Sequence, residues 1–339
     1  MLRRKVVRTD AELECPHLDA GLRERGVDLA LLPDGIAEGA FLEAVRDAEI
    51  LLMCYTPVTA RVIGAARNLR GIVKYGVGID AIDIDAAKAR GIPVVNIPEY
   101  AERTVAEGAF TLLLALAKKL APMYTAMRRD GWIWPGANWL GNDIAGKTVG
   151  LVGVGRIGRS MAQMAGAGFR ARVLGYDPHV SAEQMHAAGV EKRDQLHALL
   201  AESDFVSIHC VLNDSTRGLI GAAELARMKS GAVLINVSRG AIVDELALVR
   251  ALHEGRLGGA GLDVFSSEPL KRADHPLGPL FGMDNVILTP HLTFFTHEAM
   301  RRLEAEALER CDELLGGKPV LVKSRDPRLT SQQHGVRFG

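Results

Sequence analysis

The sequence has few cysteines, no long apolar run and no excess charge of either sign. Its 4 cysteines lie far apart among 339 residues, with no CxxC pair and no histidine at zinc-ligand spacing. This argues against a disulfide framework or a metal site, and favours a reducing compartment. The longest apolar stretch, 109–117, is much shorter than the ~20 residues that cross a bilayer.

The charge balance and the first residues exclude further classes. Lys plus Arg and Asp plus Glu each number 41, so no positive field holds nucleic acid or an anionic membrane. The basic residues at the start are not followed by the apolar region that a signal peptide needs. We therefore expect a soluble cytoplasmic protein with a small-molecule substrate and neither a nucleic-acid nor a membrane partner.

Length and periodicity predict two α/β domains. A chain of 339 residues corresponds to roughly two domains. Short apolar runs alternate with amphipathic helical segments in two series, roughly 1–100 and 145–290, and parallel strands need such helical crossovers. We predict two doubly wound parallel sheets. Their strands are expected at 27–32, 50–53, 71–74 and 93–96, and then at 148–152, 172–176, 205–209, 232–237, 259–264 and 286–288.

Four further segments lie outside this alternation. A long apolar helix is expected at 104–120, followed by WIWPGANWL at 132–140, which holds all three tryptophans. That window is interpreted either as a packed loop over a core or as an arm that docks on a second subunit. Apolar residues at 3.6 spacing predict a helix over 297–315. The polar, non-periodic tail from 323 to 339 is expected to be frayed or loosely packed.

A glycine-rich loop follows the first strand of the second series. Gly153, Gly155 and Gly158 form a GxGxxG between an apolar strand and a helix, which indicates a Rossmann dinucleotide site. Asp177 ends the next strand, where a carboxylate would bind ribose hydroxyls and favour NAD over NADP. The alternatives are a structural turn for the loop and a helix cap or solvated acid for Asp177.

Three polar residues follow later strands. Arg239, Glu268 and His291 are expected at the carboxyl edge of the sheet, where open α/β sheets bind ligands. Histidine suits proton transfer near neutral pH, a carboxylate orients an imidazole, and an arginine fork holds a substrate carboxylate. Taken singly, they could be a loop histidine, a solvated acid and a surface ion pair. Together they predict hydride-transfer chemistry on a keto acid.

Four segments carry a resemblance across nearly the whole chain. They read KYGVGIDAIDIDAAKARGIPVVNIP, VGLVGVGRIG, LINVSRGAIVDELALVRALHEGRLGGAGLDVFSSEP and NVILTPHLT. With these segments the chain resembles the D-isomer-specific 2-hydroxyacid dehydrogenase family. The resemblance implies NAD as cofactor, a homodimer, and a flavodoxin-like substrate domain beside a Rossmann NAD-binding domain. The expected divisions are 1–100 plus 295–323 for the substrate domain, 101–294 for the NAD-binding domain with a dimerisation arm near 120–142, and 324–339 for the tail.

The resemblance also implies roles for individual residues. His291 is the proton donor and acceptor, Glu268 its orienting acid and Arg239 the substrate-binding arginine, with the amides of Val77 and Gly78 as a second hold on the substrate carboxylate. Expected cofactor contacts are Val77, Gly153, Gly155, Arg156, Ile157, Gly158, Asp177, Cys210, Thr216, Val237, Ser238, Arg239, Asp263 and His291.

Two departures bear on the substrate. Phe294 lies in a bulky run similar to that of D-lactate dehydrogenases and is expected to narrow the pocket. Tyr55 stands near where phosphoglycerate dehydrogenases tend to place a basic residue, which disfavours a phosphorylated substrate. The sequence predicts an NAD-dependent reductase of small 2-keto acids. The alternatives are a dinucleotide-sensing, corepressor-like interaction protein on the same fold and a formate dehydrogenase.

Overall fold

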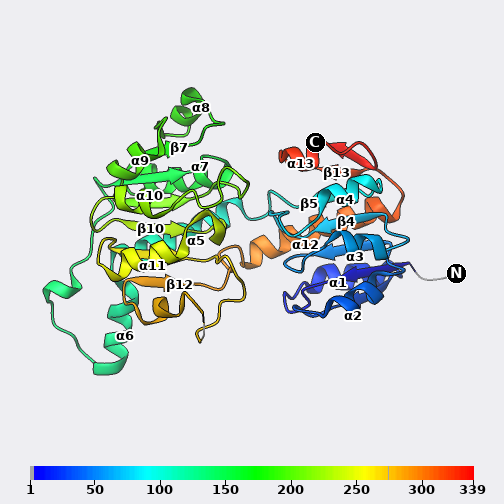
Figure 1. Cartoon of the computed structure of the whole chain (residues 1–339), viewed down its shortest axis with the longest axis horizontal. Coiled ribbons are helices and arrows are strands. Elements are labelled where there is room, and N and C mark those ends of the chain that lie inside the picture. Colours follow the sequence, from blue (N-terminus) through cyan, green and yellow to red (C-terminus); the bar gives the residue numbers. More distant parts are fainter. Residues whose placement is uncertain (1–3, 274) are drawn as a thin grey trace. The chain divides into compact units, whose positions relative to one another are not determined.

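The computed structural model describes residues 4–273 and 275–339, and the chain divides into two compact units. The first unit combines the chain up to Ala101 with Thr296–Gly339, and the second is the continuous segment Glu102–Phe295 (Figure 1). Each unit is built on a parallel sheet with helical crossovers, so the predicted α/β class with two parallel sheets is confirmed.

In the first unit, the described residues form a five-stranded parallel sheet. Its order is β2 (Asp28–Leu31), β1 (Lys5–Arg8), β3 (Ile50–Met53), β4 (Gly71–Lys74) and β5 (Val94–Asn96). The helices are α1 (Pro16–Glu24), α2 (Glu38–Val45), α3 (Ala60–Ala65), α4 (Ile84–Ala89) and α12 (His297–Leu315). A Cβ on Gly71 would lie 2.6 Å from the side chain of Leu314, so this glycine lets α12 pack directly on β4.

Strand β1 is absent from the strands predicted above. It pairs with both β2 and β3, yet only Val6 and Val7 give it an apolar signal. Its last residue, Arg8, is buried and forms two hydrogen bonds of 2.8 Å with the carboxylate of Asp19 on α1. A buried charge is tolerated when it is paired in this way, so the strand can include a buried charged residue.

In the second unit, the described residues form a seven-stranded parallel sheet. Its order is β12 (Val286–Leu288), β11 (Gly259–Leu262), β10 (Val233–Asn236), β9 (Phe205–Ile208), β6 (Thr148–Val152), β7 (Arg172–Tyr176) and β8 (Glu191–Lys192). The helices are α5 (Glu102–Ala117), α6 (Leu120–Asp130), α7 (Arg156–Gln163), α8 (Ala182–Ala187), α9 (Leu196–Glu202), α10 (Ala222–Arg227) and α11 (Glu245–His253). A π-helical turn, Met164–Gly168, extends α7.

Both faces of this second sheet are covered by apolar side chains. Alternate residues of β10 belong to different core clusters, with Leu234 in one and Val233 and Ile235 in the other. Strand order reverses at β6, which lies between β7 and β9. In open α/β sheets such a reversal leaves a crevice at the carboxyl ends of the strands, where ligands bind.

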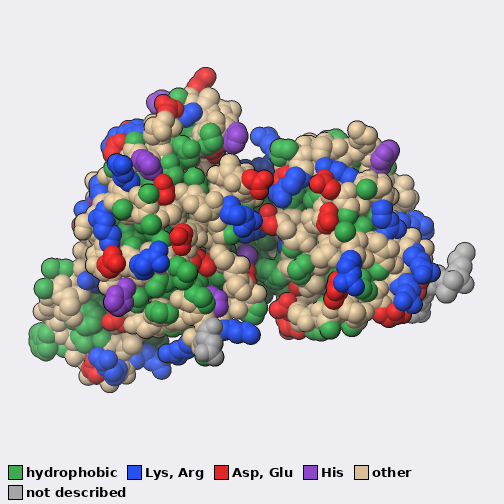
Figure 2. All heavy atoms as spheres, in the orientation of Figure 1, with side chains coloured by type: hydrophobic (Ala, Val, Ile, Leu, Met, Phe, Trp, Pro, Cys, Tyr) green, Lys and Arg blue, Asp and Glu red, His purple; other side chains and the backbone are tan. Residues whose placement is uncertain are grey.

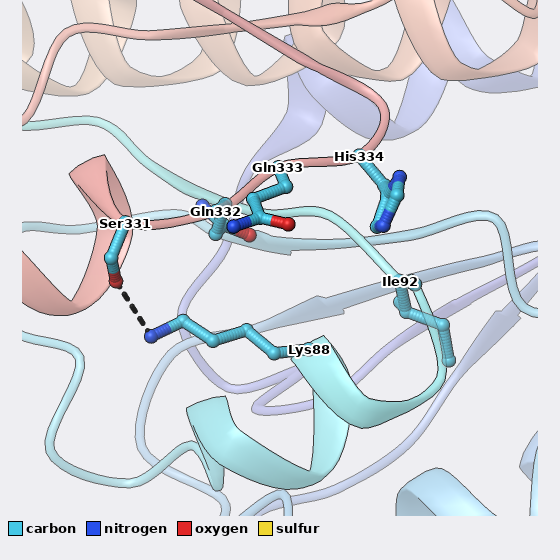
Figure 3. A pocket seen from close by; sticks show the side chains of 7 residues that line it. Lys88, Ile92, Ser331, Gln332, Gln333 and His334 are labelled. Carbon is cyan, nitrogen blue, oxygen red and sulfur yellow. Dashed lines mark hydrogen bonds between the residues drawn. The ribbon is translucent and has the colours of Figure 1, made fainter.

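The prediction of a frayed tail is wrong. Residues after α12 form β13 (Val320–Val322), α13 (Pro327–Thr330) and β14 (Val336–Phe338). Gln332 is buried, and its side-chain amide accepts from the backbone N–H of Val94 (2.7 Å) and donates to the Val94 carbonyl (2.8 Å). These two bonds satisfy the outward-facing backbone groups of Val94 on the edge strand β5. Gln332 also lines the pocket drawn in Figure 3. The contact of Gln332 with β5 is thus made of hydrogen bonds, which an apolar pattern cannot reveal.

The segment 120–142, called the arm below, carries α6 and the tryptophan window. Trp132 and Trp134 are 71% and 79% exposed, which excludes the packed-loop interpretation for these two residues. Leu120, Tyr124 and other apolar side chains of the arm are also exposed, and hydrophobic side chains gather on this projection in Figure 2. The described residues contain no helix with the length and apolarity that a bilayer crossing requires.

Candidate active site

The predicted glycine-rich loop connects β6 to α7. Gly153 has a φ of +97°, and a Cβ there would lie 2.4 Å from the backbone nitrogen of Cys210, so only glycine fits. A Cβ on Gly158 would lie 2.3 Å from the Gly153 carbonyl oxygen, so this glycine lets α7 start against the loop. A Cβ on Gly155 would meet no atom within 4 Å. The open space before the N-terminus of α7 fits a bound pyrophosphate.

Asp177 follows β7 directly and stands beside this loop. Its carboxylate accepts hydrogen bonds from the backbone N–H groups of Val154 (3.0 Å) and His179 (2.9 Å). Because a carboxylate offers about four acceptor positions, these bonds leave capacity for ribose hydroxyls. The guanidinium of Arg156, at the start of α7, lies 3.1 Å from the carboxylate of Glu102 on α5. The loop and Asp177 therefore suit a dinucleotide cofactor.

The other predicted cofactor residues lie on and after neighbouring strands. The hydroxyl of Ser238 donates to the Cys210 carbonyl (2.5 Å), which ties the ends of β10 and β9 together. Burial raises the pKa of the Cys210 thiol to about 12, so this cysteine is not a thiolate at neutral pH. The hydroxyl of Thr216 is bonded within its own loop, Val237 is buried, and Ile157 packs against the core. Contact of these residues with a cofactor stays a prediction.

Arg239 and the Glu268 loop are brought together by a glycine. Arg239 lies beyond the end of β10 and is followed by Gly240, where a Cβ would lie 2.1 Å from the backbone carbon of Phe265. The backbone after β10 therefore touches the backbone after β11, which carries Glu268. Glu268 accepts from the Phe265 N–H (2.8 Å), and Glu245 of α11 accepts from the Ser266 N–H of the same loop (2.7 Å).

Glu268 and His291 lie within hydrogen-bond distance, as a carboxylate that orients an imidazole would. The Nδ1 atom of His291 lies 2.8 Å from Oε2 of Glu268, and the two side chains are 25% and 30% exposed. Burial alone would raise the pKa of Glu268, but the hydrogen bond and charge of His291, the Phe265 N–H and the charge of Arg239 outweigh it. The pKa of Glu268 is therefore below its ordinary value, and this carboxylate stays ionised beside the imidazole.

The backbone at His291 has an unusual conformation. His291 has a φ of +58°, in the left-handed region that costs a non-glycine residue roughly 1–2 kcal/mol. The carboxylate of Asp263 accepts from the backbone N–H groups of Leu292 (3.0 Å) and Thr293 (3.1 Å) and from the hydroxyls of Thr289 and Thr293 (both 2.6 Å). Asp263 thereby fixes the turn that presents His291.

Two contributions at this edge of the sheet were not predicted. Asn236 ends β10, donates to the Arg239 carbonyl (2.9 Å) and accepts from the Ser238 N–H (3.0 Å), so it shapes the turn that carries Arg239. The turn-forming role of Asp263 was also missed, since it was predicted only as a cofactor contact. Both are buried polar residues at the end of an apolar run, and that position was the available signal.

The remaining predicted substrate residues divide between the units. Tyr55, Val77 and Gly78 lie in the first unit, where the Val77 carbonyl accepts from the side-chain amide of Asn96 (2.6 Å). Phe294 lies in the second unit, is buried, and packs edge-on against the neighbouring Phe295 ring (centroids 6.0 Å apart). Its effect on a substrate pocket stays a prediction.

Comparison with known proteins points to one family. A sequence model described as "D-isomer specific 2-hydroxyacid dehydrogenase, NAD binding domain" matches residues 110–293, more than half of the chain. A glyoxylate reductase of Korarchaeum cryptofilum is 42% identical over 265 residues, covering 77% of this chain and 78% of that protein.

Two further similarities extend over more of the chain. A D-3-phosphoglycerate dehydrogenase of Methanocaldococcus jannaschii is 38% identical over 302 residues, covering 89% of this chain but 56% of that protein. The chain thus spans about half the length of the phosphoglycerate dehydrogenases it matches. The structure of a D-lactate dehydrogenase from Aquifex aeolicus, complexed with NAD and lactic acid, is 28% identical with a TM-score of 0.82, covering 92% of this chain and 96% of that one.

Proposed function

The chain belongs to the D-isomer specific 2-hydroxyacid dehydrogenase family, an NAD-dependent oxidoreductase family, and from this premise we propose that it reduces small 2-keto acids to D-2-hydroxy acids. In this proposal the second unit is the NAD-binding domain and the first the substrate domain. The observation that carries the proposal is the His291–Glu268 pair, with Arg239 close enough to lower the pKa of Glu268.

The roles of these residues follow from their chemistry. NADH, when bound, supplies the hydride that reaches the carbonyl carbon C2. Arg239 holds the substrate carboxylate through its planar fork, and the first unit contributes Tyr55 and the amides of Val77 and Gly78. Negative charge develops on the carbonyl oxygen, and His291 donates a proton to it. Since Glu268 engages Nδ1, the transferring atom is Nε2, and the ionised carboxylate stabilises the imidazolium that donates.

The residue at position 55 favours a small substrate without a phosphate group. Tyr55 has no positive charge and cannot form the bidentate bonds that an arginine gives a phosphate. The matched relatives include both glyoxylate reductases and phosphoglycerate dehydrogenases, and the Tyr55 argument favours the former class of substrate. We propose glyoxylate, hydroxypyruvate and pyruvate as the compounds to test first.

The arm supports a proposal that the active form is a homodimer. Its exposed apolar side chains include Leu120, Tyr124, Trp132, Trp134 and Leu140, and large aromatic side chains are enriched at subunit interfaces. A second copy of this chain would bury them.

The test of the proposed activity is His291→Ala. Turnover of the preferred keto acid should fall by something like 10²–10⁴-fold, the usual contribution of a positioned general acid, while NADH still binds. NADH oxidation followed at 340 nm and NADH fluorescence titration measure the two effects. Full turnover in the variant would refute the role of His291.

A screen with the unaltered chain separates the enzyme from the dinucleotide-sensing alternative. NADH consumption is measured with glyoxylate, hydroxypyruvate, pyruvate and bulkier 2-keto acids, and formate is tested in the oxidising direction with NAD⁺. Turnover of at least one keto acid supports the proposal. Tight NADH binding with no turnover across the panel would favour the sensor instead.

A further inference from the structure

Two buried charges of opposite sign lie on either side of one peptide bond in the first unit. The bond joins Cys54 to Tyr55, just after β3. Its N–H, from Tyr55, donates to the carboxylate of Asp10 (3.0 Å), and its carbonyl oxygen, from Cys54, accepts from the ammonium of Lys74. Asp10 is 2% exposed and Lys74 is 6% exposed. This peptide plane is therefore held at both ends by charge-assisted hydrogen bonds, which are the strong kind.

Both oxygens of the Asp10 carboxylate accept hydrogen bonds, from residues 54–56 and from Thr9, the residue before Asp10. Besides Tyr55, it accepts from the backbone N–H groups of Cys54 (2.8 Å) and Thr56 (3.0 Å), from the Thr56 hydroxyl (2.8 Å) and from the Thr9 hydroxyl. Asp10 itself has a φ of +56°, a left-handed conformation that costs a non-glycine residue energy. Three consecutive amides thus converge on one carboxylate.

Lys74, the last residue of β4, approaches the same peptide from its carbonyl side. Its Nζ atom also lies 3.4 Å from the Cys54 thiol and 5.5 Å from the centre of the Tyr55 ring. Gly76 has a φ of +151°, and a Cβ there would lie 3.1 Å from Nζ, so the glycine makes room for the ammonium. The Lys74 charge therefore contacts both the backbone before Tyr55 and the face of its ring.

Charge burial on this scale exceeds what a turn requires. Taking an ammonium and a carboxylate out of water costs several kcal/mol each, and the two groups do not form an ion pair with each other among the described residues. Neutral hydroxyl or amide groups would satisfy the same backbone atoms at lower cost. What the charges add is a fixed direction for the peptide plane before Tyr55, and the Lys74 ammonium also lies beside the Tyr55 ring, where it restricts the side chain.

We propose that Asp10 and Lys74 are positioning residues that fix Tyr55, and that they thereby determine which 2-keto acids the first unit accepts. This inference rests on the proposed function, in which Tyr55 contacts the substrate. Neither residue takes part in proton or hydride transfer. Loosening the Cys54–Tyr55 peptide should weaken substrate binding and discrimination, while the rate of the chemical step at saturation is kept.

The experiment compares Asp10→Asn and Lys74→Met with a matched control, Glu304→Gln. Glu304 is a buried carboxylate of the same unit that accepts a backbone N–H from Leu18 (2.9 Å) and not from residues 54–56. For each protein, kcat and KM are measured with glyoxylate, pyruvate and a branched 2-keto acid, and the Kd for NADH is measured by fluorescence. We expect KM to rise about tenfold in the two test variants, with kcat within about twofold and the NADH Kd unchanged.

The discrimination between 2-keto acids is a readout that a loss of stability alone would not change. The ratio of kcat/KM between glyoxylate and the branched acid should move toward unity in Asp10→Asn and Lys74→Met, as in Tyr55→Ala, but not in Glu304→Gln. The double variant Lys74→Met/Tyr55→Ala should lose no more discrimination than Tyr55→Ala alone, because the lysine acts through the tyrosine. Wild-type discrimination in both test variants, or additive losses in the double variant, would overturn the inference.

A milder variant covers the case in which Asp10→Asn does not fold. Thr56→Val removes one of the five hydrogen bonds to the carboxylate and should shift the same ratio in the same direction, by about two- to threefold. Unchanged selectivity in Thr56→Val together with Lys74→Met would count against the inference. Failure of the proposed function has a different signature, since the unaltered chain would then turn over none of the keto acids.

Discussion

Replacing Glu268 with glutamine tests whether its charge, and not only its shape, supports proton transfer. Glutamine can still accept the Phe265 N–H, but it presents a neutral amide to Nδ1 of His291. Hydrogen bonds to charged groups contribute about 1.5–3 kcal/mol. Because the two side chains are 25% and 30% exposed, we take the lower end, about 1.5 kcal/mol, which corresponds to roughly tenfold in an equilibrium or a rate.

The expected result is a loss of turnover. In Glu268→Gln no carboxylate charge stabilises the imidazolium that donates the proton, so kcat/KM for reduction should fall about tenfold. The assay is NADH oxidation at saturating cofactor. Glu245→Gln is the matched control, because Glu245 accepts the Ser266 N–H on the same loop without being bonded to His291. An unchanged kcat/KM in Glu268→Gln would refute the reasoning.

The same variant predicts a pH-dependent stability difference. The pKa of Glu268 is lower in the folded chain than in the unfolded one, so its ionisation stabilises the fold above the unfolded pKa of about 4.3. The contribution is lost as the pH falls through the lower, folded pKa. The free energy of unfolding in urea should therefore differ between wild type and Glu268→Gln at pH 7, and the difference should shrink only as the pH falls below the unfolded pKa of about 4.3 and through the lower, folded one.

Three other outcomes follow from the described contacts. Gly155→Ala should fold normally yet weaken NADH binding, which fluorescence titration measures. Gly158→Ala should lower the melting temperature, which a thermal-shift assay measures, because only at Gly158 would a Cβ meet backbone atoms. Gln332→Ala should cost about 2–4 kcal/mol in urea unfolding by leaving both outer groups of Val94 unpaired, while exposed Ser331→Ala stays within about 0.5 kcal/mol; equal stabilities would contradict the account of the tail. Trp134→Ser should weaken the proposed dimer at least about tenfold in analytical ultracentrifugation; unchanged association would remove the arm from the interface.

The strands predicted from the sequence were those with continuous apolar runs. Ile50–Met53 and Thr148–Val152 are buried on both faces of their sheets and were predicted with the bounds the structure shows. The strand ending at Arg8 was missed because its stability depends on a partner, Asp19, whose proximity no local pattern reveals. Gln332 was missed for the same reason, since a polar residue in a non-periodic tail gives no sign that it will pair with Val94.

At the site, residue type allowed us to predict the candidate catalytic side chains. It did not predict the residues that hold those side chains in place. Glu268 and His291 are paired as expected from their positions after two strands. The turn-forming roles of Asn236 and Asp263 depend on hydrogen bonds between loops, and such bonds follow from tertiary geometry. The close contact at Gly240 is a similar case, because only the folded chain shows the backbone that a Cβ would strike.

The discontinuity of the first unit has a consequence for how the chain folds during synthesis. The second unit, Glu102–Phe295, is one continuous segment, so all its strands leave the ribosome before α12 does. In the part of the first unit that is synthesised first, the surface of β4 stays uncovered until α12 has been made and Leu314 can pack on Gly71. We therefore expect nascent chains arrested before α12 to protect the later-made unit from protease and to leave the earlier-made one open to cleavage.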